Sequence, residues 1–155
     1  MDNNNRQNST NINWYPGHME KAKRLMMKEY KNIDVVYELI DARIPKSSKI
    51  KNIYDIIGNK PKIVIMTKKD LADPIGVEKW VKYYENLGTK VIVADLNDDN
   101  DIKKIINLTH ELMEELQIKR EVKGMFRKEI RALVVGIPNV GKSSFVNTLC
   151  NRKNF

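Results

Sequence analysis

Residues 132–143 read ALVVGIPNVGKS and decide the fold. The apolar residues ALVV are typical of a buried β-strand, and residues 136–143 fit the pattern Gly, four residues, Gly-Lys-Ser. Helix-forming residues 144–150 come next. Because Gly136 and Gly141 let the backbone bend closely around an anion, its N–H groups and the start of the following helix can point at phosphate. A strand, this loop and a helix in that order predict a P-loop that binds a nucleoside triphosphate.

The side chains of the loop have distinct expected roles. Lys142 is expected to reach the β and γ phosphates, and the Ser143 hydroxyl to ligate Mg²⁺. The predicted phosphate-binding residues are Asn139, Val140, Gly141, Lys142, Ser143 and Ser144. The loop does not select the base, so this motif alone leaves both ATP and GTP open.

Four apolar runs alternate with helix-forming stretches along the chain. The expected strands are 34–41, 62–67, 90–95 and 130–136. The expected helices are 19–31, with a basic face, 50–58, 75–88 and 100–117. This alternation predicts an α/β fold of the P-loop NTPase class, with a three-layer arrangement in which helices flank a parallel sheet. Ligands of such sheets bind beyond the carboxyl ends of the strands.

A second motif lies at the carboxyl end of the strand 62–67. A carboxylate at Asp70 can accept from both N1–H and the 2-amino group of guanine, whereas adenine offers no such pair of donors. The predicted guanine-binding residues are Thr67, Lys68, Lys69, Asp70, Asp95 and Leu96, the last two through their backbone. Alone, the motif Thr-Lys-Lys-Asp also fits an ordinary strand-to-helix turn. Joined to the phosphate loop, it favours guanine nucleotide.

Composition limits the class of protein. A chain of 155 residues is long enough for one ordinary core, and no apolar run approaches the roughly 18 residues that span a bilayer. Residues 1–13 are Asn-rich without an apolar core, which predicts a disordered leader and not a secretory signal. Cys150 is the single cysteine, so no internal disulfide can form. These features predict a cytoplasmic protein without a membrane partner.

The net charge points to a polyanionic partner. The formal charge is +8 and the pI is near 9.5, and such a surface attracts RNA through screened attraction and counterion release. The alternative is an AT-rich genome that over-uses Lys and Asn. The charged stretch 118–131 is interpreted as a solvated linker, with RNA contact as its alternative reading.

The motifs stand in an unusual order, with the guanine motif ahead of the phosphate loop. Together with Trp-Tyr-Pro-Gly-His-Met at 14–19 and Asp-Ala-Arg-Ile-Pro at 41–45, this order resembles the circularly permuted GTPases of the RbgA type, also called YlqF. The resemblance runs from about residue 13 to the end of the chain. It implies a bacterial factor that binds GTP and GDP with Mg²⁺, docks on a large ribosomal subunit precursor and its rRNA, and hydrolyses GTP when the ribosome stimulates it.

The resemblance also assigns roles to single residues. His18 matches the histidine that assists hydrolysis in this family, although without the resemblance it would be read as a turn residue. Asn139 matches a position that helps hold K⁺ in potassium-dependent relatives. Thr67 stands where the family commonly has Asn, so part of a brace on the phosphate loop is expected to be lost and nucleotide affinity to be reduced.

Length is the larger departure from the family. We expect residues 14–155 to form a circularly permuted G domain that lacks the switch regions and the C-terminal RNA-binding domain. The chain is therefore interpreted as a fragment that is monomeric and does not turn over GTP alone. Two alternatives stay open: a nucleotide-binding or RNA-binding module without turnover, and an ATP-using phosphoryl-transfer enzyme.

Overall fold

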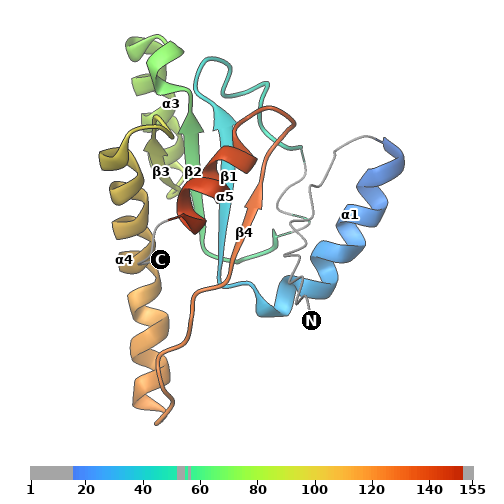
Figure 1. Ribbon diagram of the computed structural model, residues 1–155, viewed down its shortest axis with the longest axis vertical. Coiled ribbons are helices and arrows are strands. Elements are labelled where there is room, and N and C mark those ends of the chain that lie inside the picture. The colour runs from blue at the N-terminus through green and yellow to red at the C-terminus, as the bar shows by residue number, and fades with distance from the viewer. Residues whose placement is uncertain (1–15, 52–54, 56, 152–155) are drawn as a thin grey trace, which may run out of the picture.

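A four-stranded parallel sheet forms the centre of the molecule, as the alternating apolar runs predict. The computed structural model describes residues 16–51, 55 and 57–151. The strands are β1 (Val35–Asp41), β2 (Lys62–Thr67), β3 (Lys90–Val93) and β4 (Ala132–Val135). Their order across the sheet is β3-β2-β1-β4, and all neighbours are parallel (Figure 1). All strands therefore deliver their carboxyl ends to one edge of the sheet.

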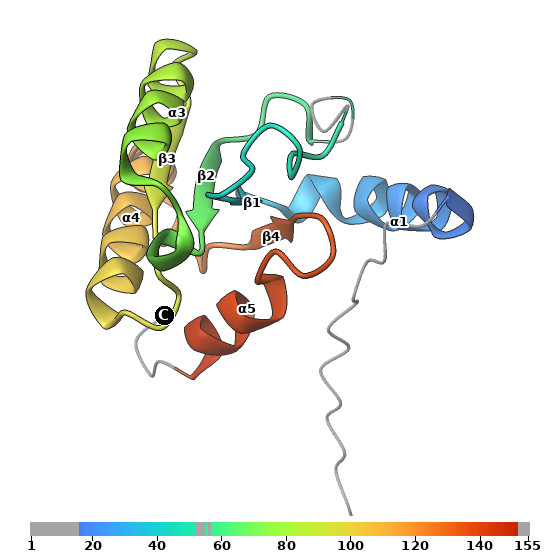
Figure 2. The same ribbon diagram turned by 90° about the horizontal axis from the view of Figure 1, so that it is seen from above.

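Helices cover both faces of the sheet and give the predicted three layers. The helices are α1 (Pro16–Glu29), η1 (Tyr30–Asn32), η2 (Lys69–Leu71), α3 (Pro74–Asn86), α4 (Asp99–Val122) and α5 (Lys142–Cys150). Side chains of α4 and α5 share one core cluster with β1 and β2, whereas α3 packs on the opposite face. Helix α1 extends away from the sheet in both views (Figure 1, Figure 2).

The central strand β1 explains why the sheet is so well covered. All seven of its residues are buried, and successive side chains alternate between the two faces. On one face Tyr37 packs edge-to-face on Phe145 of α5, with ring centroids 5.2 Å apart. On the other face Ile40 lies in the same cluster as Tyr84 of α3. A strand buried on both sides needs apolar residues at almost every position, which is the pattern the sequence has.

Helix α4 is longer than expected and corrects the predicted linker. It runs from Asp99 to Val122, so the first five residues of the stretch interpreted as a linker are helical. Asp98 caps its amino terminus by accepting from the N–H of Asn100, and Gly124 follows its end with a φ of 73°. A left-handed residue of this kind is a common helix stop. The irregular connector is therefore confined to residues 123–131.

Two other expectations fall wholly or partly on residues outside those that the structure describes. The leader 1–13 and Trp14 lie outside them, and so does part of the helix expected over 50–58, of which Asp55 and Ile57 are helical. Helix α1 begins at Pro16, three residues before the predicted start. Among the described strands, β4 is paired on one side only, so the strand before the phosphate loop lies at an edge of the sheet. None of the described helices combines the length and apolarity that a membrane span requires.

Candidate functional site

The loop between β4 and α5 has the close-packed backbone that its two glycines predict. Gly141 has a φ of 111°, in the left-handed region that favours glycine, and stands directly before the first residue of α5. A Cβ on Gly136 would lie 2.7 Å from Cγ1 of Val140 and 3.0 Å from the carbonyl oxygen of Leu39. Any side chain at this position would collide with the loop or the central strand. The glycines thus let the loop curl tightly over the end of β4.

Lys142 and two serines open the helix that follows this loop. The Lys142 Nζ donates to the carbonyl of Gly136 at 2.7 Å, so its side chain folds back across the loop. Partial burial lowers the pKa of Lys142, because a low-dielectric site disfavours the ammonium. An anion bound within the loop would reverse that effect. Ser143 and Ser144 are exposed in the first turn of α5, where hydroxyls can face a ligand.

The guanine motif and the phosphate loop touch each other. The Thr67 hydroxyl, at the end of β2, donates to the carbonyl of Val140 at 2.7 Å. The Nζ of Lys68 donates to the carbonyl of Asn139 at 2.9 Å. These contacts join residues more than 70 positions apart. The hydroxyl at Thr67 thus braces the loop, and the reduced nucleotide affinity expected from losing an amide there stays a prediction.

Leu96 approaches the same loop from the end of the neighbouring strand. A Cβ built on Gly141 would lie 3.0 Å from Cδ1 of Leu96 and 3.9 Å from Cγ2 of Thr67. The ends of β2 and β3 therefore both reach the phosphate loop. We call the surface formed by residues 67–70, 95–96 and 136–144 the nucleotide rim.

Asp41 fixes Lys68, a role the sequence analysis did not assign. Lys68 has a φ of 60°, and its Nζ lies 3.2 Å from Oδ2 of Asp41. Asp41 is buried at the end of β1 and also accepts from the backbone N–H and from Nε and Nη2 of Arg43. Hydrogen bonds from the Arg43 side chain are the main reason that the pKa of Asp41 falls to about 2, against the opposing effect of burial. Asp41 is therefore an anion at neutral pH that orients Lys68.

Asp101 also holds neighbouring residues in position, at the part of the nucleotide rim that follows β3. It is 1 % exposed, at the start of α4, and accepts from the backbone N–H of Asp95 at 3.0 Å. Lys69 and Lys104 form ion pairs with its two oxygens. Burial acts to raise the pKa of Asp101, but these hydrogen bonds outweigh it and lower the pKa. This buried carboxylate holds the turn after β3 in place.

Asp70, at one end of the nucleotide rim, lines a cavity that faces α3. Asp70 and Asp95 line a cavity of about 510 Å³ with apolar residues of α3, and no residue of the phosphate loop is among its described lining. Asp70 is exposed and stands two residues after Lys68 in the chain. Lys68 itself contacts the phosphate loop at Asn139, so Asp70 belongs to a segment that borders this loop.

The structure brings part of the predicted guanine-binding set to the phosphate loop. It brings Thr67, Lys68 and Leu96 into contact with the phosphate loop, whereas Lys69 turns to Asp101. His18 belongs to α1, and its side chain lies outside the described part of the structure. No role was predicted for the buried aspartates 41 and 101; the one available signal was that position 41 ends a largely apolar run.

Comparison of the sequence with known proteins finds relatives that are named as ribosome-associated GTPases. The model of the family described as 50S ribosome-binding GTPase matches residues 131–155, which contain the phosphate loop. Ribosome biogenesis GTPase A of Priestia megaterium is 44% identical over 143 residues, covering 92% of this chain and 50% of the relative. Mitochondrial ribosome-associated GTPase 1 of Mus musculus is 36% identical over 137 residues, covering 88% and 41%.

Solved structures agree with these relatives. The GNP-bound YlqF of T. maritima matches with a TM-score of 0.61 and 26% identity, covering 85% of this chain and 48% of that one. The resemblance to the circularly permuted YlqF-type GTPases is confirmed. A GDP-bound structure of the same YlqF gives the same TM-score. The chain spans about half the length of the YlqF-type relatives it matches.

Proposed function

We propose that the chain binds guanine nucleotide at the nucleotide rim and belongs to a GTPase that acts in assembly of the large ribosomal subunit. The observation that carries this proposal is the direct contact of Thr67 with Val140 and of Lys68 with Asn139. This contact supports the proposal that the base-recognition motif and the phosphate loop share one ligand. Relatives named as ribosome biogenesis GTPases support the cellular role.

The triphosphate fits the chemistry of the loop residues. GTP and GDP would be held by N–H groups of residues 139–144 and by the ammonium of Lys142. Partial burial disfavours the charge of Lys142, and a phosphate beside its ammonium would offset that cost. The exposed Ser143 hydroxyl would ligate Mg²⁺, and the exposed Asn139 side chain would contribute to a K⁺ site. Both metal assignments are part of the proposal.

Base selection rests on Asp70, and its substitution tests the proposal most directly. Asp70→Asn should relax the preference for GTP over XTP, because an amide can donate to the carbonyl that xanthine has in place of the guanine 2-amino group. The two affinities are measured by titration of fluorescent analogues. Asp73→Asn is the matched control, since Asp73 caps α3 through the N–H of Gly76 and an amide oxygen can do the same. An unchanged preference in Asp70→Asn, or a higher affinity of the chain for ATP, would contradict the assignment.

Hydrolysis is a separate part of this proposal, because GTP turnover depends on several parts that position the water and stabilise charge. His18 is proposed to orient or deprotonate the attacking water, as an imidazole can. In a full-length protein, His18→Ala should retain GTP affinity and lose ribosome-stimulated hydrolysis. Equal turnover would leave His18 with a structural role.

The partners follow from charge and from the relatives. A monomer of charge +8 in the cytoplasm would be attracted to rRNA on a large-subunit precursor. Co-sedimentation with precursor particles, with GDP or a non-hydrolysable GTP analogue, tests this part of the proposal. Binding that is independent of both the nucleotide and the salt concentration would argue against it.

A further inference from the structure

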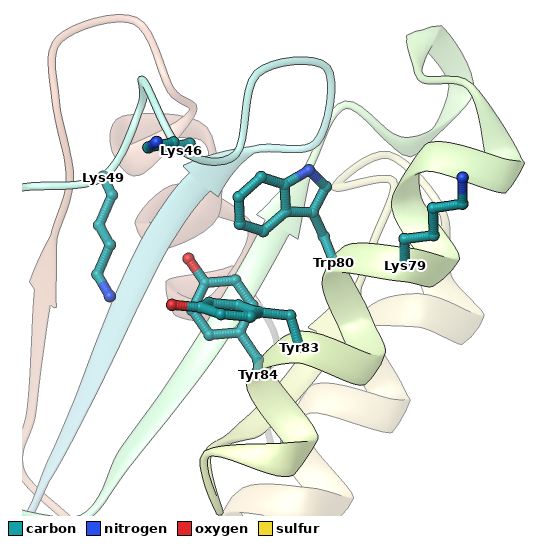
Figure 3. Close-up of a pocket in the computed structure, with 6 residues that line it drawn as sticks. All are labelled: Lys46, Lys49, Lys79, Trp80, Tyr83 and Tyr84. Atoms are coloured by element: carbon teal, nitrogen blue, oxygen red, sulfur yellow. The ribbon is translucent and has the colours of Figure 1, made fainter.

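A second cavity, away from the nucleotide rim, combines aromatic and basic side chains. It has a volume of about 410 Å³ and is lined by Lys46, Lys49, Lys79, Trp80, Tyr83 and Tyr84. The aromatic residues come from α3, and two of the lysines come from the segment after β1 (Figure 3). The described lining contains three cations and no acidic residue. None of these residues belongs to the nucleotide rim.

The three aromatic residues form one cluster, which is buried at Tyr84 and exposed at Tyr83. Tyr84 is 2 % exposed and packs in the core beneath α3, Trp80 is half-buried, and Tyr83 is 51 % exposed. The Trp80 and Tyr83 rings lie 5.4 Å apart, and the Tyr83 and Tyr84 rings 5.5 Å apart, both in edge-to-face geometry. The packed neighbours limit the orientations of Tyr83. An aromatic side chain that is fixed and yet half-exposed offers a ready surface for a flat apolar ligand.

The lysines surround this aromatic surface with positive charge. The Nζ of Lys49 lies 5.3 Å from the centroid of the Tyr84 ring, a cation–π contact. Lys46 and Lys79 are exposed, and within the described part of the chain neither pairs with a carboxylate. By contrast, Lys82 on the same helix is paired with Glu78. The charge of Lys46 and Lys79 is therefore available to an anionic ligand.

The segment that carries two of these lysines is anchored firmly to the sheet. Ser48 is fully buried, and its Oγ accepts from the backbone N–H of Asp41 at 2.8 Å. The N–H of Ser48 donates to the carbonyl of Ile44 at 3.0 Å. Lys46 and Lys49 thus extend from a fixed turn opposite α3. A preformed site of this kind loses little conformational entropy when a ligand binds.

We propose that this cavity binds an unpaired nucleotide of RNA, with the base packed against Tyr83 and Trp80 and the flanking phosphates near Lys46 and Lys79. Stacking on aromatic side chains combined with lysine contacts to the backbone is how proteins hold single-stranded nucleic acid. A base in a duplex could not enter, because its faces are already stacked. The inference adds a specific RNA contact to the proposed function, and that the RNA is ribosomal rests on that function.

The test uses the complete 155-residue chain and a fluorescein-labelled 12-nucleotide oligoadenylate, measured by anisotropy at several salt concentrations. Tyr83→Ala should weaken binding roughly 5-fold or more, since base stacking on an aromatic residue is worth about 1–3 kcal/mol. Lys79→Gln should weaken binding and reduce the slope of log K against log salt by about 0.7, the value for one lost phosphate contact on a single strand. A 2-aminopurine in the oligonucleotide should change its fluorescence on binding to the wild type and not to Tyr83→Ala.

Matched controls distinguish a loss of contacts in the cavity from a loss of general positive charge and from a loss of folding. Phe126→Ala removes another exposed aromatic residue, and Lys82→Gln removes a paired lysine of α3; both should bind the oligonucleotide within about 2-fold of the wild type. Thermal melting checks that Tyr83→Ala is folded, as expected for a half-exposed residue. Equal losses in the cavity variants and the controls would overturn the proposal, as would equally tight binding of a duplex of the same length. Because GTP titration of each variant is independent, failure here leaves the guanine-nucleotide proposal standing.

A protein ligand is the competing occupant that the same experiment detects. If the cavity were built for a peptide, Tyr83→Ala and Lys79→Gln would leave oligoadenylate binding intact while both reduced association with ribosomal precursor particles. That pattern would contradict the RNA assignment.

Discussion

Networks of polar bonds lie at both ends of the parallel sheet, but the carboxyl-end network is the more buried one and the two hold different segments. At the carboxyl end Asp41 binds Arg43 and Lys68, and Thr67 donates to Val140. Each of these bonds ends on a residue of the proposed nucleotide rim or orients one. The network at this end therefore fixes side chains and carbonyls that would surround a ligand.

At the amino end the bonds hold a connector. Asp34, just before β1, accepts from Nζ of Lys128 and from the N–H of Arg131, and Gln117 of α4 bonds to the backbone of Lys128 in both directions. These bonds attach residues 123–131 to the body of the domain. Lys128 is thus engaged with an acidic residue, which favours reading this stretch as a connector over the alternative of RNA contact. The difference suggests a simple rule: substitutions at either end cost stability, but only those at the carboxyl end should cost nucleotide affinity.

The largest expected effect comes from the two lysines at opposite ends. Lys142→Ala removes the ammonium proposed to bind the β and γ phosphates, so GTP affinity should fall roughly 100-fold, or about 2.7 kcal/mol. Lys128→Ala, its counterpart, leaves Asp34 without its cation and should lower stability by about 1–3 kcal/mol while GTP affinity stays unchanged. Titration with a fluorescent GTP analogue and chemical denaturation measure the two quantities. Retained GTP affinity in Lys142→Ala would remove the phosphate loop from the binding site.

A second prediction concerns how the stability contributed by Asp41, the carboxylate at the carboxyl end, depends on pH. The folded pKa of Asp41 is about 2, below the usual value near 3.9, so its contribution to stability is present above about pH 4 and is lost as the pH falls toward 2. The contribution is about 2 kcal/mol. Asp41→Asn should lose most of that stability at pH 7 and show a flatter acid limb in denaturation curves recorded from pH 7 to pH 2.

The nucleotide affinity of the same variants completes that comparison. Without the carboxylate of Asp41, Lys68 is no longer held against the phosphate loop, and GTP affinity should fall several-fold. Asp34→Asn should lose stability and keep its GTP affinity. If both variants bound GTP like the wild type, the Asp41 network would have no part in positioning the rim.

How far the sequence alone predicts this molecule depends on the kind of information each feature needs. The strands β1 and β2 are predicted to within one residue, because their side chains are buried on both faces and the apolar runs end where burial ends. The meeting of Thr67 with the phosphate loop follows from topology, since parallel strands end at one edge. The predicted carboxyl end of helix α4 falls five residues too early, because charged residues at its exposed carboxyl end resemble a linker.

The parts that the sequence did not predict depend on side chains brought together from separate segments. Asp101 has no local pattern that distinguishes it from its exposed neighbours, and only the fold places it under the turn at Asp95. The cavity at Tyr83 needs α3 and the segment after β1 to face each other. Neither spacing nor composition carries that information.

A third prediction uses two buried threonines as a matched pair. Thr67 donates to the carbonyl of Val140, whereas Thr109 of α4 donates to the carbonyl of Ile105 and bonds to the Tyr37 hydroxyl at 2.7 Å, away from the rim. Replacing either by Val keeps the shape and removes hydrogen bonds, so each variant should lose about 1–2 kcal/mol of stability. A several-fold loss of GTP affinity is expected for Thr67→Val alone. Equal affinities in the two variants would mean that this brace does not shape the phosphate loop.

The smallest effect on stability is expected from a substitution of Arg127, in the exposed part of the connector. Arg127 pairs with Glu114 and Glu121 of α4, and all three side chains are about half exposed. Solvent and salt screen such pairs, so Arg127→Gln should lower the melting temperature by less than about 3 °C. The difference from the wild type should shrink further in 1 M NaCl, and GTP affinity should not change. A large loss of stability that persists at high salt would show that the connector holds the sheet through this arginine, and the amino-end network would then rest on more than its bonds to Asp34.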